Sequence, residues 1–130
     1  MEVLAGSGRQ GFADGAGAAA QFSYPYGVAV DGEGSIIVTD GSNNRVRKIT
    51  PDGTVSTLAG SGSQGFADGA GAAAQFNSPF GVAVDGEGSI IVTDYNNHRV
   101  RKITPDGTVS TLAGSGREGF ADGTGAAAQF

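Results

Sequence analysis

A glycine spacing that can bind phosphate occurs three times in the chain. Gly-x-Gly-x-x-Gly begins at Gly6, Gly60 and Gly114. In a dinucleotide site this spacing lets backbone N–H groups approach a pyrophosphate, and the motif must lie between a strand and a helix. Here Phe-Ala-Asp-Gly follows each motif and interrupts a helix, and the flanking segments have the pattern of hairpins. The sequence therefore predicts a flexible surface link and no bound cofactor.

Carboxylate and amide oxygens recur in short polar segments. Residues 31–34 and 40–44 are rich in Asp, Glu or Asn, and Asp68 and Asp122 occupy matching positions. Calcium takes about six to eight oxygen ligands from a preorganised loop, and the EF-hand spacing is missing here. Asp and Asn side chains also bond their own backbone in turns. We therefore expect turns and no metal site, with a ring of repeated carboxylates around a channel as the alternative.

Residues for catalysis and for nucleic-acid binding are sparse. His98 is the single imidazole, and no Gly-x-Ser-x-Gly segment supplies a nucleophile. Basic residues cluster at 45–48 and 99–102, where strand alternation places two arginines on one face and the lysine on the other. Because the net charge is −5, we expect these cations to pair with acidic neighbours. The sequence predicts no enzyme activity, no nucleic-acid partner and no membrane partner.

A repeat of 54 residues accounts for the whole chain. Residues 23–76 and 77–130 align without a gap and are identical at 45 of 54 positions. Residues 1–22 are a partial third copy, so the expected organisation is 1–22, 23–76 and 77–130. Near-identity of this kind indicates recent amplification or design, and it also fits a piece of a longer repeat array. Cysteine is absent, which excludes a disulfide framework and leaves the compartment undecided.

The two units differ mainly in segments expected to form turns. Tyr95, Asn96 and His98 stand where the first unit has Gly41, Ser42 and Asn44, while Tyr24 and Tyr26 stand where the second unit has Ser78 and Phe80. These residues form a candidate polar and aromatic binding surface, comprising Tyr95, Asn96, His98, Tyr24 and Tyr26. Exposed loop tips also tolerate change, and neutral drift is the simpler interpretation.

Each unit has the pattern of four short strands joined by turns. Residues 27–31, 35–39, 45–49 and 54–59 are rich in β-branched residues, and glycine-containing turns separate them. A longer glycine- and alanine-rich link, 60–76, leads to the next unit. We expect one helical turn over 71–76, with Phe76 in the groove between units. The predicted fold class is all-β, with four-stranded antiparallel blades.

The residues of each unit resemble the NHL repeat. In the second unit they are Pro79-Phe80-Gly81-Val82-Ala83-Val84-Asp85, Ile91-Val92-Thr93-Asp94, Asn97 and Arg99-Val100-Arg101-Lys102-Ile103. The resemblance implies a β-propeller, which in this family typically has about six blades. The link 60–76 is longer than in the shortest NHL units and resembles a long-repeat form.

Two blades alone would leave two apolar faces in water, because each blade buries both faces against neighbours. We therefore expect the chain to be its own partner: a homo-oligomeric ring, with a six-bladed trimer favoured over an eight-bladed tetramer. Either segment 1–22 or segment 109–130 would be displaced at each junction, or the extra ends would exchange between copies. The expected function is a self-assembling structural scaffold. A general binding module is the alternative, and a metal-dependent lactonase or lyase comes third.

Overall fold

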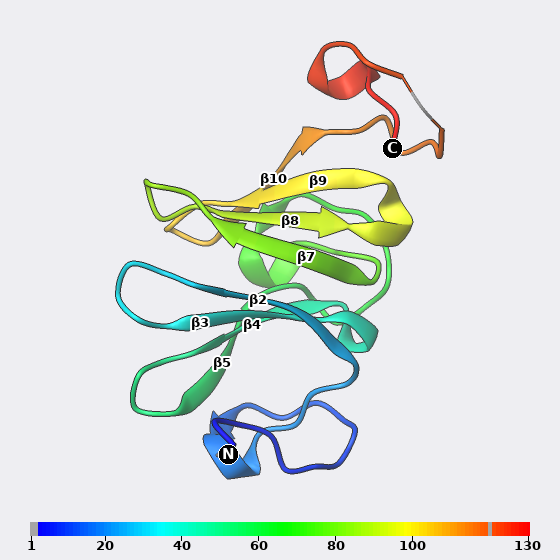
Figure 1. Cartoon of the computed structure of the whole chain (residues 1–130). Helices are drawn as coiled ribbons and strands as arrows, with labels where there is room; N and C mark the ends of the chain where they lie inside the picture. Colours follow the sequence, from blue (N-terminus) through cyan, green and yellow to red (C-terminus); the bar gives the residue numbers. More distant parts are fainter. Residues whose placement is uncertain (1–2, 120) are drawn as a thin grey trace.

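The computed structural model describes residues 3–119 and 121–130, and in this part of the chain two antiparallel β-sheets pack face to face (Figure 1). We call these sheets blade 1 and blade 2. Blade 1 contains β2 (Pro25–Val30), β3 (Ile36–Asp40), β4 (Arg45–Ile49) and β5 (Thr54–Ala59). Blade 2 contains β7 (Pro79–Val84), β8 (Ile90–Asp94), β9 (Arg99–Ile103) and β10 (Thr108–Ala113). The all-β prediction is confirmed.

Each blade has a fifth strand, so the prediction of four strands per blade is wrong. β1 (Gly15–Ala16) pairs with β5, and β6 (Gly69–Ala70) pairs with β10. Both added strands come from the segment that precedes the blade in the chain. Their sequence was not recognisable as a strand, because glycine and alanine carry little β-propensity.

Three equivalent segments connect or flank the blades: the N-terminal link 6–22, the central link 60–76 and the C-terminal link 114–130. The central link is ordered rather than a loose surface segment. The Gly60 N–H donates to the Gly71 carbonyl at 2.9 Å, and the Ser61 N–H donates to the Ala74 carbonyl at 2.9 Å. The expected helical turn is a 3-10 helix, η3 (Gly71–Ala73), matched by η1 (Gly17–Ala19) and η5 (Gly125–Ala127) in the other links.

Two further 3-10 helices, η2 (Gly41–Asn43) and η4 (Tyr95–Asn97), replace the turns expected between the second and third strands of each repeat. Each ends at a residue in the left-handed region, Asn44 with φ 54° and His98 with φ 55°. Asn and His adopt this conformation more readily than most residues. Among the described residues, no helix has the length and apolar character needed to cross a membrane.

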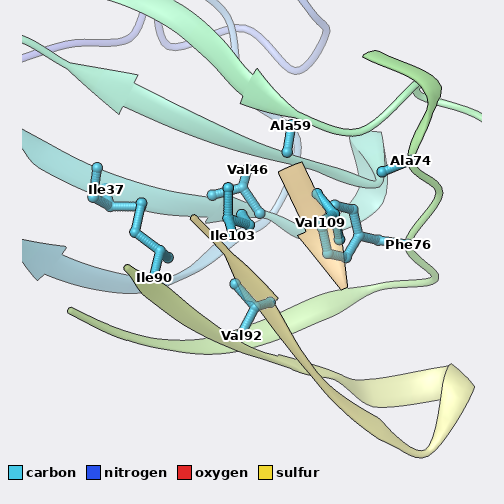
Figure 2. Packing of buried hydrophobic residues seen from close by; sticks show 9 residues of the cluster. All are labelled: Ile37, Val46, Ala59, Ala74, Phe76, Ile90, Val92, Ile103 and Val109. Carbon is cyan, nitrogen blue, oxygen red and sulfur yellow. The ribbon is translucent and has the colours of Figure 1, made fainter. Parts of the chain in front are cut away.

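The main hydrophobic core lies between the blades, where side chains from both sheets and the central link meet (Figure 2). Phe76 and Ala74 of the link are fully buried, which confirms the expected place of Phe76. The other members are Ile37, Val46 and Ala59 of blade 1 and Ile90, Val92, Ile103 and Val109 of blade 2. Apolar burial across this contact therefore holds the two blades together.

Backbone atoms also approach closely across the blades. A Cβ on Gly27 would lie 2.4 Å from the Phe80 carbonyl oxygen, so glycine is required at this position. The Thr39 hydroxyl donates to the same carbonyl at 2.6 Å. A hydrogen bond and a close backbone approach thus fix how one blade sits on the next.

Candidate functional site

A buried arginine lies at the centre of each blade and binds the preceding link. Arg101 on β9 is fully buried and forms an ion pair with the buried carboxylate of Asp94 at 2.6 Å. It also bonds the Asp68 carboxylate at 2.9 Å and the carbonyls of Ala67 and Gln75 at 2.7 and 2.9 Å. Arg47 on β4 makes the matching contacts 54 residues earlier. These arginines attach the link to the blade.

Asp94 is the last residue of β8, and its carboxylate accepts hydrogen bonds from three donors. The Asn77 N–H donates at 2.8 Å, the Asn97 amide at 2.6 Å and the Arg101 guanidinium at 2.6 Å. Burial raises the pKa of the Asp94 carboxyl above its ordinary value, although these hydrogen bonds oppose the rise. Burying a charged pair is favourable only when such partners satisfy both groups. The contacts therefore give Asp94 and Arg101 a structural role, and among the described residues the Arg101 Nε is the one atom of this pair left without a hydrogen-bond partner.

Three further basic side chains, Arg45, Lys48 and Arg99, also have partners. Arg45 lies over the ring of Phe12 at 3.7 Å and Arg99 lies over Phe66 at 3.7 Å, each in a cation–π contact. Lys48 approaches Asp31 at 3.9 Å. Pairing with acidic neighbours, as the sequence indicated, thus holds for Arg47, Lys48 and Arg101, whereas Arg45 and Arg99 stack on aromatic rings instead.

The acidic turns bond their own backbone. The Asp85 carboxylate accepts from the N–H groups of Glu87 and Ser89 at 2.9 Å, and these bonds hold the pKa of Asp85 below its ordinary value. Asp31 accepts in the same way from Glu33 and Ser35. Within residues 3–119 and 121–130, no three His, Cys, Asp or Glu side chains are grouped so as to hold a metal ion.

Three aromatic rings gather at one end of the blades. Tyr26 and Phe80 lie 4.7 Å apart between ring centroids, and Phe80 and Tyr95 lie 5.9 Å apart. All three side chains are exposed. Together with Ser78 and Asn96 they line a cavity of about 390 Å³. We call these five residues the aromatic surface.

The structure brings together only part of the predicted binding surface. Tyr26, Tyr95 and Asn96 belong to the aromatic surface. His98 lines a neighbouring cavity with Phe130, which Tyr95 also borders, and Tyr24 lies against the N-terminal link. Several positions that differ between the repeats are in contact: the Asn96 amide donates to the Ser78 hydroxyl at 3.2 Å, and a Cβ on Gly41 would lie 2.4 Å from the Tyr26 ring. Some of the positions that differ between the repeats are therefore neighbours in space.

Two apolar faces of the chain remain open. The front face of blade 1, defined by Phe22, Val28, Val38 and Ile49, borders a groove of about 450 Å³. Val38 and Ile49 are buried in a small cluster that includes Ala20 of the N-terminal link. Val28 on this face is 65% exposed. The back face of blade 2 is defined by Ile91, Val100 and Leu112, and Leu112 is 46% exposed. Faces of this kind mark interaction sites in soluble proteins.

Comparison with known proteins identifies the class. The NHL repeat model matches residues 22–49 and 76–103, which are the first three strands of each blade. The chain belongs to the NHL-repeat β-propeller family.

Curated relatives agree with this assignment. Protein SUPPRESSOR OF QUENCHING 1 of Arabidopsis thaliana is 40% identical over 69% of this chain, and NHL repeat-containing protein 2 of Gallus gallus is 35% identical over 74%. The matches cover 9% and 13% of those relatives, so the chain spans a small part of their length.

Solved structures show the same blade arrangement. A protein of unknown function from Bacteroides thetaiotaomicron is 32% identical, with a TM-score of 0.75 over 82% of this chain and 28% of that one. An auxiliary nutrient binding protein from the same organism has 28% identity and a TM-score of 0.69 over 83% of this chain and 28% of its own. A gluconolactonase from Xanthomonas campestris shares the fold at 22% identity, with a TM-score of 0.57 over 75% and 28% of the two chains.

Proposed function

We propose that this chain is a non-catalytic structural module that assembles with copies of itself into a closed propeller ring, with three copies supplying six blades. One observation carries the proposal. The two open faces of the chain are repeat copies of the two surfaces that already meet inside it. The front face of blade 1 on one copy is therefore built to receive the back face of blade 2 on another.

The front faces of the two blades can be compared residue by residue. In blade 2, Phe76, Val92 and Ile103 are fully buried against blade 1. Their repeat counterparts in blade 1 are Phe22, Val38 and Ile49, which pack in a second and smaller apolar cluster. Because these residues are identical in type and spacing, the front face of blade 1 fits the same kind of surface that covers blade 2.

The back faces give the complementary half of the contact. Ile37 and Val46 of blade 1 are fully buried under blade 2, whereas their counterparts Ile91 and Val100 are partly exposed. Thr39 donates its hydroxyl to Phe80 of the next blade, and the counterpart Thr93 lies exposed on the open side. Docking between copies would repeat this contact. Head-to-tail contacts of this kind close into a ring when the rotation from one copy to the next is a whole fraction of a full turn.

The absence of catalysis in this proposal is supported by how the polar residues are used. The arginines and their carboxylate partners join links to blades, and the turn carboxylates bond backbone N–H groups. The lactonase among the structural relatives supports a common fold alone. A catalytic site built from these residues would have to break contacts that hold the blades together.

A charge placed on an open face tests the proposal. We expect Val28→Asp to convert the assembled protein to a single chain, because docking would bury an unpaired carboxylate at a cost of several kcal/mol, on the order of 3–5. Val28 is largely exposed in the single chain, so the blades themselves should stay folded. Native mass spectrometry with circular dichroism measures both properties.

The matched control adds the same charge away from the open faces. A Cβ on Gly32 meets nothing within 4 Å, so Gly32→Asp should keep the wild-type mass. Leu112→Asp, on the back face of blade 2, should dissociate the assembly as Val28→Asp does. A Val28→Asp protein that retains the wild-type mass would contradict docking through this face.

Binding of a small ligand is the second candidate function, and the aromatic surface favours it. Exposed aromatic rings stack against flat partners, and the Asn96 amide and Ser78 hydroxyl beside them can bond ligand hydroxyls. In an NMR titration with neutral disaccharides, we expect shifts at Tyr26 and Tyr95 and none at Tyr24. Unchanged spectra at the aromatic surface would remove this candidate for saccharides.

A further inference from the structure

The described residues of the C-terminal link 114–130 repeat the hydrogen bonds that shape the other two links. The Gly114 N–H donates to the Gly125 carbonyl at 2.8 Å, and the Ser115 N–H donates to the Ala128 carbonyl at 2.8 Å. The central link makes the same two bonds at 2.9 Å each. Figure 1 shows this segment (red) beyond β10, on the side of blade 2 away from blade 1. The link is therefore preorganised for the surface that its two copies bind.

The N-terminal and central links each bind the buried arginine of the blade that follows them. The N-terminal link supplies Arg47 with the Asp14 carboxylate at 2.9 Å and with the carbonyls of Ala13 and Gln21 at 2.7 and 2.9 Å. The Thr57 hydroxyl adds a bond to Asp14 at 3.1 Å. The central link supplies the same groups to Arg101 of blade 2.

The C-terminal link presents these groups with no arginine beside them. Ala121 and Gln129 form the same bridge as their copies, Ala67 and Gln75. Asp122 is exposed and forms no ion pair with any described residue. The link thus carries a carboxylate and two carbonyls arranged for a guanidinium that this copy does not supply.

We propose that residues 114–130 of one copy bind around Arg47 of the next copy and displace residues 6–22 of that copy, so that the ring closes by exchange of a segment. This inference rests on the proposed ring and adds to it a residue, Asp122, that one copy contributes to a buried site of its neighbour.

Chain continuity decides which link occupies the site. Ala113 ends β10 and pairs with Val100 of β9, and Gly114 follows directly, as Gly60 follows Ala59. Docking of blade 2 would therefore place Leu112 and Ala113 where Leu4 and Ala5 now lie in the groove of blade 1. Leu4 and Ala5 belong to no strand. Leu112 and Ala113, which are fixed in a sheet, should therefore displace Leu4 and Ala5 from the groove. The C-terminal link directly follows Ala113, so its effective concentration near Arg47 is high.

The displaced link is held by Arg47, by the buried Ala20 and by a short strand pairing, and its copy at the C-terminal end offers equivalent residues for each contact. β1 pairs with β5 through only two residues, Gly15 opposite Val55 and Ala16 opposite Thr54. The Asp14 side chain is 43% exposed, so its ion pair with Arg47 is solvated on one side. Segments with few buried contacts and exposed hydrogen bonds open at low cost. The equivalent link of the neighbouring copy is already folded, so it loses little conformational entropy when it binds in the same place.

A disulfide trap tests the exchange in the full chain, which has no cysteine of its own. Asp122→Cys combined with Thr57→Cys places the two thiols on different copies at the site where Thr57 now bonds Asp14. After mild oxidation we expect covalent species of two and three chains on a non-reducing gel. Asp14→Cys with Thr57→Cys should give almost no disulfide within the chain, because residues 6–22 have left the site.

Two controls calibrate the trap. Asp68→Cys with Thr111→Cys is the matched pair within one chain, where the side chains lie 3.0 Å apart, and it should oxidise without raising the mass. Asp106→Cys with Thr57→Cys places one thiol in an exposed turn and should form no specific link. If the native mass shows a ring while Asp122→Cys with Thr57→Cys stays single-chain on the gel, the exchange is wrong and the ring stands. A single-chain native mass for the wild type would refute both proposals.

Discussion

Asp94→Ala is expected to destabilise the folded chain by about 3–5 kcal/mol, because removing the buried partner of an ion pair leaves the buried Arg101 with only the half-exposed carboxylate of Asp68. Arg101 is fully buried and cannot neutralise itself by losing a proton. The substitution also leaves the Asn77 N–H and the Asn97 amide without their acceptor. Chemical denaturation followed by circular dichroism measures the loss.

The second carboxylate on Arg101 provides the control. The Asp68 side chain is 46% exposed, so water screens its ion pair and replaces its hydrogen bonds. Asp68→Ala should therefore cost about 1 kcal/mol or less. Asp94→Asn, which keeps the shape and loses the charge, should fall between the two. Equal losses of unfolding free energy for Asp94→Ala and Asp68→Ala would contradict the claim that the buried Asp94–Arg101 pair contributes more than the exposed one.

Phe76→Ala is expected to cost about 3–5 kcal/mol, because a fully buried ring between the blades would leave a cavity. Phe76 contacts the core that joins blade 1 to blade 2 and also ends the central link (Figure 2). The loss should therefore appear as separation of the two blades as well as a lower unfolding midpoint. Thermal unfolding together with amide hydrogen exchange reports both changes.

The repeat supplies the matched variant. Phe22 has the same place in the N-terminal link and is partly exposed on the open face. In the Leu112→Asp background, which is expected to keep the protein as a single chain, Phe22→Ala should cost less than half as much as Phe76→Ala. A larger loss at Phe22 than at Phe76 would show that the main core lies elsewhere.

The strands of the blades were predictable because their sequence patterns are local. Residues 45–49 and 54–59 match β4 and β5 as the structure has them, and β2 and β3 differ from the prediction by one or two residues at their ends. Glycine-containing turns and β-branched runs carry this information within a few residues. The same holds for the NHL resemblance, which the family comparison confirms.

The buried arginines and the fifth strands were not predictable in the same way. The sequence indicated that Arg47 and Arg101 would pair with acidic residues, and it did not indicate that both would be fully buried. Their partners Asp14 and Asp68 lie 33 residues away, in links whose sequence suggested a flexible segment. Contacts of this kind depend on how the link folds over the blade, which no local pattern encodes.

The candidate binding surface was only partly predictable for a related reason. Tyr26, Tyr95 and Asn96 line one cavity, while His98 and Tyr24 line two others. All five residues were chosen because they differ between the repeats. The structure adds that Phe80 lies between Tyr26 and Tyr95, so the cluster spans the contact between the two blades.

The solution mass of the unmodified chain tests the central claim most directly. Native mass spectrometry at low micromolar concentration should show one main species at three times the chain mass of 12.8 kDa, equal to six blades. A species at four times that mass would keep self-assembly and correct the number of blades to eight. A well-folded single chain across the whole concentration range would contradict assembly through the open faces.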